Sequence, residues 1–375
     1  MSLSEQSNSS SRARGGLRRY ALALALCLAG TAAAAAPLKV VTSFSLLEDI
    51  TRQVGGEQVE VATLVGRNAD AHAYEPTPGD ARKLAGAQLL VVNGLQFETW
   101  LDRLQRASGF KGKTVVASDG ITPLRFSHGE EAHGHDHEKH DHGHDHKHDN
   151  DHDHDHDHDH DHDHDHDHDH DHDHDHDHGH DHGKAKAKPA ADAHAHHDHG
   201  EWDPHAWQSL ANGARYARNI AEALASMDPA NAQAYRQRAQ AYAQKLEAVD
   251  ARLKRDFAAL PAERRKAVIS HEAFGYFGQA YGLTFVPVAG LSTAAEPSAA
   301  DVARIIAQVR KEKVPALFVE NVSSPRLVEQ IARETGAKVG GTLYSDALSE
   351  PGQPAATYLD LFEWNAKQFL DALRP

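Results

Sequence analysis

Cysteine is almost absent from the 375-residue chain, whose only cysteine is Cys27. Cys27 falls in an N-terminal segment that we expect to be removed on export, so the mature protein has no thiol. This excludes a disulfide framework and a thiolate metal site. Any metal held by the folded part must therefore be bound through nitrogen and oxygen. A lipoprotein signal is also disfavoured, because Leu26 precedes Cys27 where a small residue is needed.

Long hydrophobic runs, basic patches and common catalytic motifs are missing as well. The apolar run at residues 20–30 is too short for a transmembrane helix, and no cluster of positive charge suggests nucleic-acid binding. No Gly-x-Ser-x-Gly elbow or phosphate-binding loop occurs. His271-Glu272 begins like the His-Glu-x-x-His motif, but Gly275 stands in place of the second histidine. We therefore expect a protein that is not an enzyme.

The N-terminus has the pattern of a secretory signal peptide. Four arginines precede the apolar residues 20–30, and a zone of small residues follows at 31–36. Pro37 disfavours a cut directly before it, so cleavage is expected after about residues 33–35. Arg18-Arg19 suggests twin-arginine export, but the rest of that motif is missing. The pattern predicts a periplasmic protein.

Histidine is in large excess and is concentrated in one segment. All but three of the 32 histidines lie in residues 128–199, whose centre, residues 151–178, alternates aspartate and histidine without a break. This segment carries a net charge of −19, against −16 for the whole chain, and has nearly no apolar side chains, which predicts a disordered insertion. Imidazole and carboxylate suit zinc, so we expect additional weak Zn²⁺ sites here that lose affinity as histidines protonate near pH ~6.5.

Strand and helix signals alternate on both sides of this insertion. Short apolar or β-branched runs predict strands at residues 38–42, 58–65, 89–92, 114–116, 267–269, 284–287, 316–319 and 338–343. Helical spacing occurs at 46–54, 80–87 and 97–107, from Ser298, from Ser323 or Ser324 to Gly336, and from Tyr358 onward. The alternation predicts an α/β fold of two similar lobes with mostly parallel sheets.

One long helix is expected to join the two lobes. Residues 208–257 have helical spacing, with a break where Asp228 is a candidate cap and Pro229 the first helical residue. No glycine or proline follows until after residue 258, which predicts a helix roughly 45 Å long. The predicted division is a signal peptide at 1–35, an N-terminal lobe at 36–227 containing the insertion 128–199, a linking helix at 228–260 and a C-terminal lobe at 261–375.

Three histidines lie outside the insertion, namely His72, His205 and His271. His72 and His271 follow predicted strands, and so does Asp346. Ligands bind at the carboxyl ends of strands in open α/β sheets, so these four residues predict a metal site in the cleft between the lobes. Their spacing alone also fits isolated surface residues, and the metal-attracting insertion in the same chain favours the metal site.

The stretches around these residues resemble those of a known family. They read His-Ala-Tyr-Glu-Pro-Thr-Pro from His72, Asp-Pro-His-Ala-Trp around His205, Ser-His-Glu-Ala-Phe-Gly-Tyr-Phe around His271 and Gly-Gly-Thr-Leu-Tyr-Ser-Asp up to Asp346. From about residue 38 to 374, apart from the insertion, the chain is similar to the periplasmic zinc-binding proteins of ABC importers, in the metal-specific cluster of solute-binding proteins. The resemblance implies a monomer that binds Zn²⁺ through these four residues and delivers it to a permease in the inner membrane.

Several alternatives stay open at this point. Manganese members of the family carry a carboxylate at the position of His271, so the imidazole favours zinc, with manganese as the runner-up. In some zinc members water replaces the residue equivalent to Asp346. A zinc storage protein that uses the insertion, a zinc hydrolase with a metal-bound water, and loading by a periplasmic metallochaperone also remain. Glu75, Glu98 and Glu320 are expected to be surface carboxylates rather than groups behind the ligands, and Trp207 and Tyr276 to be core or cleft-wall residues.

Overall fold

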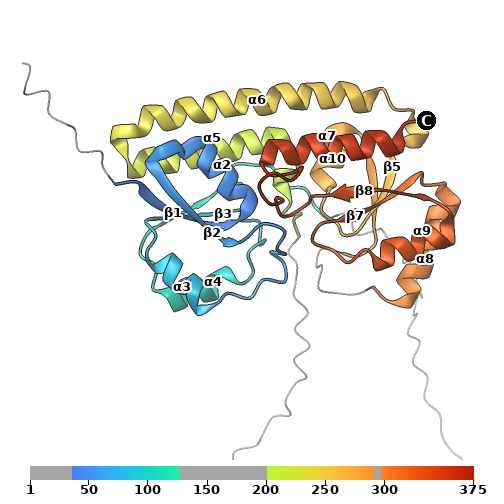
Figure 1. Cartoon of the computed structure of the whole chain (residues 1–375), viewed down its shortest axis with the longest axis horizontal. Coiled ribbons are helices and arrows are strands. Elements are labelled where there is room, and N and C mark those ends of the chain that lie inside the picture. Colours follow the sequence, from blue (N-terminus) through green and yellow to red (C-terminus); the bar gives the residue numbers. More distant parts are fainter. Residues whose placement is uncertain (1–35, 127–200, 291–296) are drawn as a thin grey trace, which may run out of the picture. The chain divides into compact units, whose positions relative to one another are not determined.

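The computed structural model describes residues 36–126, 201–290 and 297–375, which belong to one compact unit (Figure 1). The predicted signal peptide and the predicted insertion lie outside the described residues. Among the helices that are described, none combines the length and the apolar character needed to cross a membrane.

Two four-stranded parallel sheets organise this part of the chain. The first consists of β1 (Leu38–Phe44), β2 (Val59–Val65), β3 (Leu89–Val92) and β4 (Lys113–Val116), and the second of β5 (Lys266–Ile269), β6 (Thr284–Pro287), β7 (Ala316–Glu320) and β8 (Lys338–Leu343). Their strand orders are β2-β1-β3-β4 and β6-β5-β7-β8, with every neighbouring pair parallel. The two sheets share one topology, which confirms the prediction of two similar α/β lobes.

Local sequence signals set the ends of several helices. The helices between and after the strands are α2 (Ser45–Gly55), α3 (Pro78–Ala85), α4 (Leu101–Ser108), α7 (Gly275–Tyr281), α8 (Ala299–Glu312), α9 (Arg326–Thr335) and α10 (Tyr358–Leu373). The Ser298 hydroxyl accepts a hydrogen bond from the N–H of Asp301, which caps α8 as serine does at many helix starts. Gly336 ends α9 with φ +72°, a left-handed conformation that glycine adopts without strain. The start predicted for α9 was two to three residues early.

Helix α6 (Ala232–Ala258) is the predicted long helix. Its 27 residues correspond to about 40 Å. It lies beside α5 (Leu210–Met227), and it contacts α2 in the first lobe as well as α7 and α10 in the second (Figure 1). Asp228 stands at the N-cap position and Pro229 at the first position of a short 3₁₀ turn, Pro229–Asn231, that precedes α6, but the Asp228 side chain makes no capping hydrogen bond. Its carboxylate instead accepts hydrogen bonds from the Asn231 amide and the Tyr235 hydroxyl, both at 2.7 Å.

A second connection between the lobes is the segment 344–357, which leads from β8 to α10. The N–H of Leu348 donates to the Ser45 hydroxyl at 3.0 Å, and the N–H of Asn68 donates to the Leu348 carbonyl at 2.9 Å. Ser45 follows β1 and Asn68 follows β2. The segment that carries Asp346 is therefore held at the carboxyl edge of the first sheet, although the residue follows a strand of the second.

Aromatic rings fill the core of the second lobe around Phe369 of α10. Its ring centroid lies 4.8 Å from that of Phe318, 5.2 Å from Phe277, 5.3 Å from Phe285 and 5.7 Å from Phe274. The rings are tilted or edge-to-face, the arrangements that aromatic pairs prefer. This cluster joins α7 and α10 to the second sheet and so supports the loops at its carboxyl edge.

Candidate metal centre

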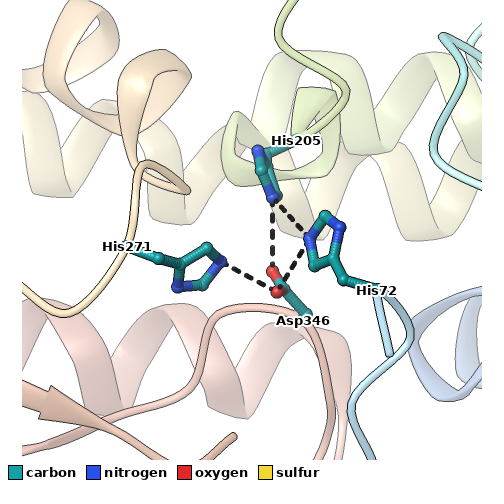
Figure 2. Close-up of side chains that lie close together, drawn as sticks. All are labelled: His72, His205, His271 and Asp346. Carbon is teal, nitrogen blue, oxygen red and sulfur yellow. Dashed lines mark hydrogen bonds and ion pairs between the residues drawn. The ribbon is translucent and has the colours of Figure 1, made fainter. Parts of the chain in front are cut away.

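Four side chains from distant parts of the chain meet at one point (Figure 2). His72, His205, His271 and Asp346 each offer one ligand atom, and these atoms lie within 4.8 Å of one another. Nε2 of His72 is 3.2 Å from Nε2 of His205 and 3.4 Å from Oδ2 of Asp346. Nε2 of His271 is 3.0 Å from the same oxygen. Tetrahedral ligands at ~2.0–2.1 Å from an ion stand roughly 3.3–3.4 Å apart, so these three spacings are close to those around a bound divalent metal ion, while Nε2 of His205 lies 3.8 Å from Oδ1 of Asp346.

Loops at the carboxyl ends of strands place three of the four residues. His72 lies in the loop between β2 and α3, His271 stands two residues after β5, and Asp346 stands three residues after β8. His205 directly precedes a short 3₁₀ turn, Ala206–Gln208, that leads into α5. The structure thus brings together all four residues that the sequence analysis singled out, at the sheet edges where ligands bind in open α/β folds.

The loop that carries His72 is fixed at both ends by side-chain hydrogen bonds. At the start of the loop, the Asp70 carboxylate accepts a hydrogen bond from the backbone N–H of His72 at 2.8 Å. The loop ends at a capping box, in which the Thr77 hydroxyl accepts the N–H of Asp80 at 3.3 Å and the Asp80 carboxylate accepts the N–H of Thr77 at 3.0 Å. The first turn of α3 therefore anchors the loop.

Because of this capping box, we expect the variant Asp80→Asn to be less stable than the unaltered protein, by an amount that depends on pH. Burial raises the pKa of Asp80, but the hydrogen bonds from Thr77, Tyr74 and Lys83 together outweigh burial, and the net shift is downward. A carboxylate whose pKa is lower in the folded than in the unfolded protein stabilises the fold. This contribution is fully present above the pKa of an unfolded aspartate, about 3.9, and is lost as the pH falls below that value. We expect the variant to be less stable by about 0.5–1 kcal/mol at pH 7. Urea unfolding should show that the difference shrinks below about pH 4; a difference that stays constant from pH 7 to pH 3 would contradict the assignment.

Two buried carboxylates stand behind the imidazoles. Nδ1 of His205 donates to Asp203 at 2.7 Å, and Nδ1 of His271 lies 2.7 Å from a Glu320 oxygen. Each carboxylate also accepts the backbone N–H of its histidine, at 2.9 and 3.1 Å. A carboxylate at Nδ1 fixes the ring and leaves Nε2 free to bind a metal, which is how outer-shell carboxylates support metal-binding histidines.

The sequence analysis misjudged some of the carboxylates near the centre. Glu320, expected at the surface, is only 1% exposed, because it is the last residue of a buried strand. Asp203 was overlooked; its only sequence signal is its place two residues before His205. Glu75 is exposed, as expected.

Glu98 is half-buried, and its carboxylate holds an unusual turn beside the centre. Its carboxylate accepts hydrogen bonds from the Ser43 hydroxyl at 2.6 Å and from the N–H groups of Asn93 and Gly94 at 2.6 and 3.1 Å. Three successive residues of this turn have positive φ, namely Gly94, Leu95 and Gln96. Glu98 was expected to be a surface carboxylate, whereas it is only half-exposed and its carboxylate satisfies backbone donors that the turn leaves free.

Aromatic rings form one wall of the centre, as expected for Trp207. The Phe97 ring stands edge-on to His72 with centroids 5.0 Å apart, and Trp207 lies 5.2 Å from His205. The indole N–H of Trp207 donates to the Ser345 carbonyl at 2.9 Å, next to Asp346. These rings exclude water from one side of the imidazoles, which strengthens electrostatic interactions among the polar groups.

The charges at the centre are coupled. Burial lowers the pKa of His72. In His271 burial acts in the same direction, but the carboxylates of Glu320 and Asp346 outweigh it and raise the pKa well above its ordinary value. Burial of Asp346 is likewise outweighed by the histidines, so its pKa lies well below the usual range. A metal ion that binds here must therefore compete with a proton.

Two parallel-sheet lobes with such a set of side chains between them define a binding protein for a metal ion. The chain belongs to the family described as zinc-uptake complex component A, periplasmic (ZnuA), whose model matches residues 40–372. It is accordingly a metal-binding protein of the class that serves ABC transporters, and the members of this class are solute-binding proteins rather than enzymes.

Named relatives differ in their metal. The manganese ABC transporter substrate-binding lipoprotein PsaA of Streptococcus pneumoniae is 26% identical, over 93% of this chain and 94% of that protein. The iron-binding protein YfeA of Yersinia pestis is 29% identical, over 86% of this chain and 82% of that protein. The solved structure of the periplasmic zinc-binding protein TroA of Treponema pallidum has a TM-score of 0.68 and 26% identity, covering 90% of this chain and 100% of that one.

Proposed function

We propose that the protein captures Zn²⁺ through His72, His205, His271 and Asp346 and delivers it to the permease of an ABC importer in the inner membrane. The observation that carries the choice of zinc is the third imidazole, His271, whose Nε2 faces the other donors. Three nitrogens and one carboxylate suit zinc, whereas manganese prefers sites richer in oxygen. Asp346 is the proposed fourth ligand, because its carboxylate is already fully buried among the histidines.

Manganese is the second candidate, because a manganese protein is among the relatives. The donor set argues against it. The two carboxylates that would enrich the site in oxygen, Asp203 and Glu320, are directed at Nδ1 of His205 and His271 instead. Carboxylates so placed raise the basicity of the imidazoles and favour the metal that imidazole binds well.

The insertion and the export signal complete the proposal. Residues 128–199 would collect zinc through weak sites and raise its concentration near the cleft by tethering. The signal at residues 1–35 would place the protein in the periplasm. The proposed partners are the permease and, for loading, a periplasmic zinc metallochaperone, with the protein acting as a monomer.

The decisive experiment is a metal titration of a variant that lacks residues 128–199. A short glycine-serine linker can replace the insertion, because an antiparallel bridge between Arg125 and Trp202 holds its ends together. We expect one tight zinc site per chain, from which excess manganese does not displace zinc. Loss of the tight site with the insertion would refute the cleft assignment and favour zinc storage by the insertion. Manganese affinity equal to that of zinc would favour the second candidate.

A further inference from the structure

The ends of the insertion are joined by residues close to the metal centre. The N–H of Asp203 donates to the Leu124 carbonyl at 2.8 Å. One step further out, Arg125 and Trp202 form the antiparallel bridge, and the Arg125 guanidinium stacks over the Trp202 ring at 5.0 Å from its centroid. We call residues 124–126 and 201–203 the neck.

Tyr276 of α7 closes the neck from the second lobe. Its hydroxyl donates to the Asp203 carbonyl at 3.0 Å and accepts the N–H of Leu124, also at 3.0 Å. One hydroxyl thus bonds to both segments of the neck. Tyr276 is only 3% exposed and Asp203 is equally buried, so water cannot readily replace either bond if the hydroxyl is removed.

Asp203 connects the neck to the metal centre. Its backbone is held by Tyr276 and Leu124, and its side chain holds His205 through both the imidazole Nδ1 and the backbone N–H. The other carboxylate oxygen lies against Gly275, where an added Cβ would stand only 2.5 Å away. Asp203 therefore fits between the start of α7 and the His205 imidazole with little freedom to shift.

The same helix also follows the third histidine. Helix α7 begins at Gly275, four positions after His271. Tyr276 thus lies on the element that continues from His271, and its hydroxyl bonds to the residue that orients His205. The hydrogen bond between Tyr276 and Asp203 therefore connects α7, which follows His271, with the residue that orients His205.

We propose that Tyr276 is a positioning residue for the metal centre, whose hydroxyl fixes the neck and, through Asp203, the orientation of His205 relative to His271. The inference rests on the proposed function, because it assumes that these histidines bind the metal. Without the hydroxyl, the Asp203 backbone loses one anchor and its carboxylate holds His205 less firmly. The metal then leaves the site more readily, although no ligand has been removed.

Tyr281 provides a matched control on the same helix. It is also a buried tyrosine, and its hydroxyl donates to the Asp250 carboxylate of α6 at 3.1 Å, with no bond to the neck. In Tyr276→Phe and in Tyr281→Phe the ring remains in place and only a hydroxyl is lost. An effect caused by general loosening of α7 would appear in both variants.

The test measures zinc release from the full-length chain loaded with one equivalent of Zn²⁺. An excess of chelator removes the metal, and tryptophan fluorescence follows its loss, since Trp207 lies beside His205. The kinetic phase of zinc release that is absent in His205→Ala is assigned to the metal centre. Outer-shell substitutions typically cost 10–100-fold in metal affinity, so we expect that phase to be about tenfold faster in Tyr276→Phe. In Tyr281→Phe its rate should match that of the unaltered protein.

Two results would overturn the inference: an unchanged release rate in Tyr276→Phe, or an equal acceleration in both variants. If the unaltered chain shows no phase that depends on His205, the proposed function itself fails, and this outcome is distinct from the other two. Thermal unfolding of both variants completes the comparison. We expect similar decreases in their midpoints, because each loses one buried tyrosine hydroxyl, so stability alone cannot produce a difference in zinc release.

Discussion

Alanine in place of His205 is expected to abolish tight zinc binding while leaving most of the zinc capacity of the full chain. His205 is fully buried, its Nε2 stands 3.2 Å from that of His72, and its Nδ1 is bonded to Asp203. The substitution removes a donor and leaves the Asp203 carboxylate buried without its imidazole. Loss of an outer-shell group costs about 10–100-fold in affinity, and loss of a ligand should exceed this.

Competition with a zinc chelator of known affinity measures this effect. The control is His160→Ala, which removes one of the many histidines of the insertion and should leave the tight site unchanged. Total zinc bound at saturation should be almost the same in both variants. If His205→Ala retains the tight site, the insertion rather than the cleft holds the metal, and the protein is better described as a zinc store.

Phe369→Ala should cause the largest loss of stability, about 3–5 kcal/mol. The Phe369 ring is fully buried and lies within 6 Å of four other rings from α7, β6, β7 and the loop before α7. Its removal would leave a cavity where α10 meets the second sheet. The free energy of unfolding, from urea titration, is the measurement.

Lys367→Ala is the matched control on the same helix. Lys367 is exposed and pairs with the exposed Asp371, so its loss should change the free energy of unfolding by less than about 0.5 kcal/mol. Equal losses in the two variants would show that the aromatic cluster does not dominate the stability of α10. Folded Phe369→Ala protein should still bind zinc, because the ring contacts none of the four donors.

Strand β3 was predictable because burial on both faces leaves a local signature, a continuous apolar run. Residues 89–92 and 338–343 were predicted as strands and are β3 and β8 with the same bounds, although β8 is mostly exposed or half-buried. Helix α4 was less predictable. It begins at Leu101 rather than at residue 97, because the preceding residues form the turn that Glu98 holds with its carboxylate. The carboxylate of Glu98 satisfies backbone donors four and five residues before it, and this leaves no mark in the helical spacing of residues 97–107.

The metal centre was also predictable from the sequence only in part. The four candidate donors were found because histidine outside the insertion is rare and three of the four follow strands. Glu320 was misjudged because a carboxylate at the end of a strand looks the same in sequence whether it faces solvent or an imidazole. The attachment of the Asp346 segment to Ser45 was not foreseen either, since the hydrogen bond links residues about 300 positions apart and leaves no local pattern.

The neck also bears on how the chain can change over evolutionary time. Its two segments are joined by the hydrogen bond between Asp203 and Leu124 and by the bridge between Arg125 and Trp202, so the chain enters and leaves the insertion at neighbouring points of the fold. Repeats of aspartate and histidine can then be gained or lost by slippage during DNA replication without shifting the register of any strand. Insertions are tolerated best at such points. An engineer could exchange the insertion for another metal-binding peptide at the same two points and keep the binding protein behind it.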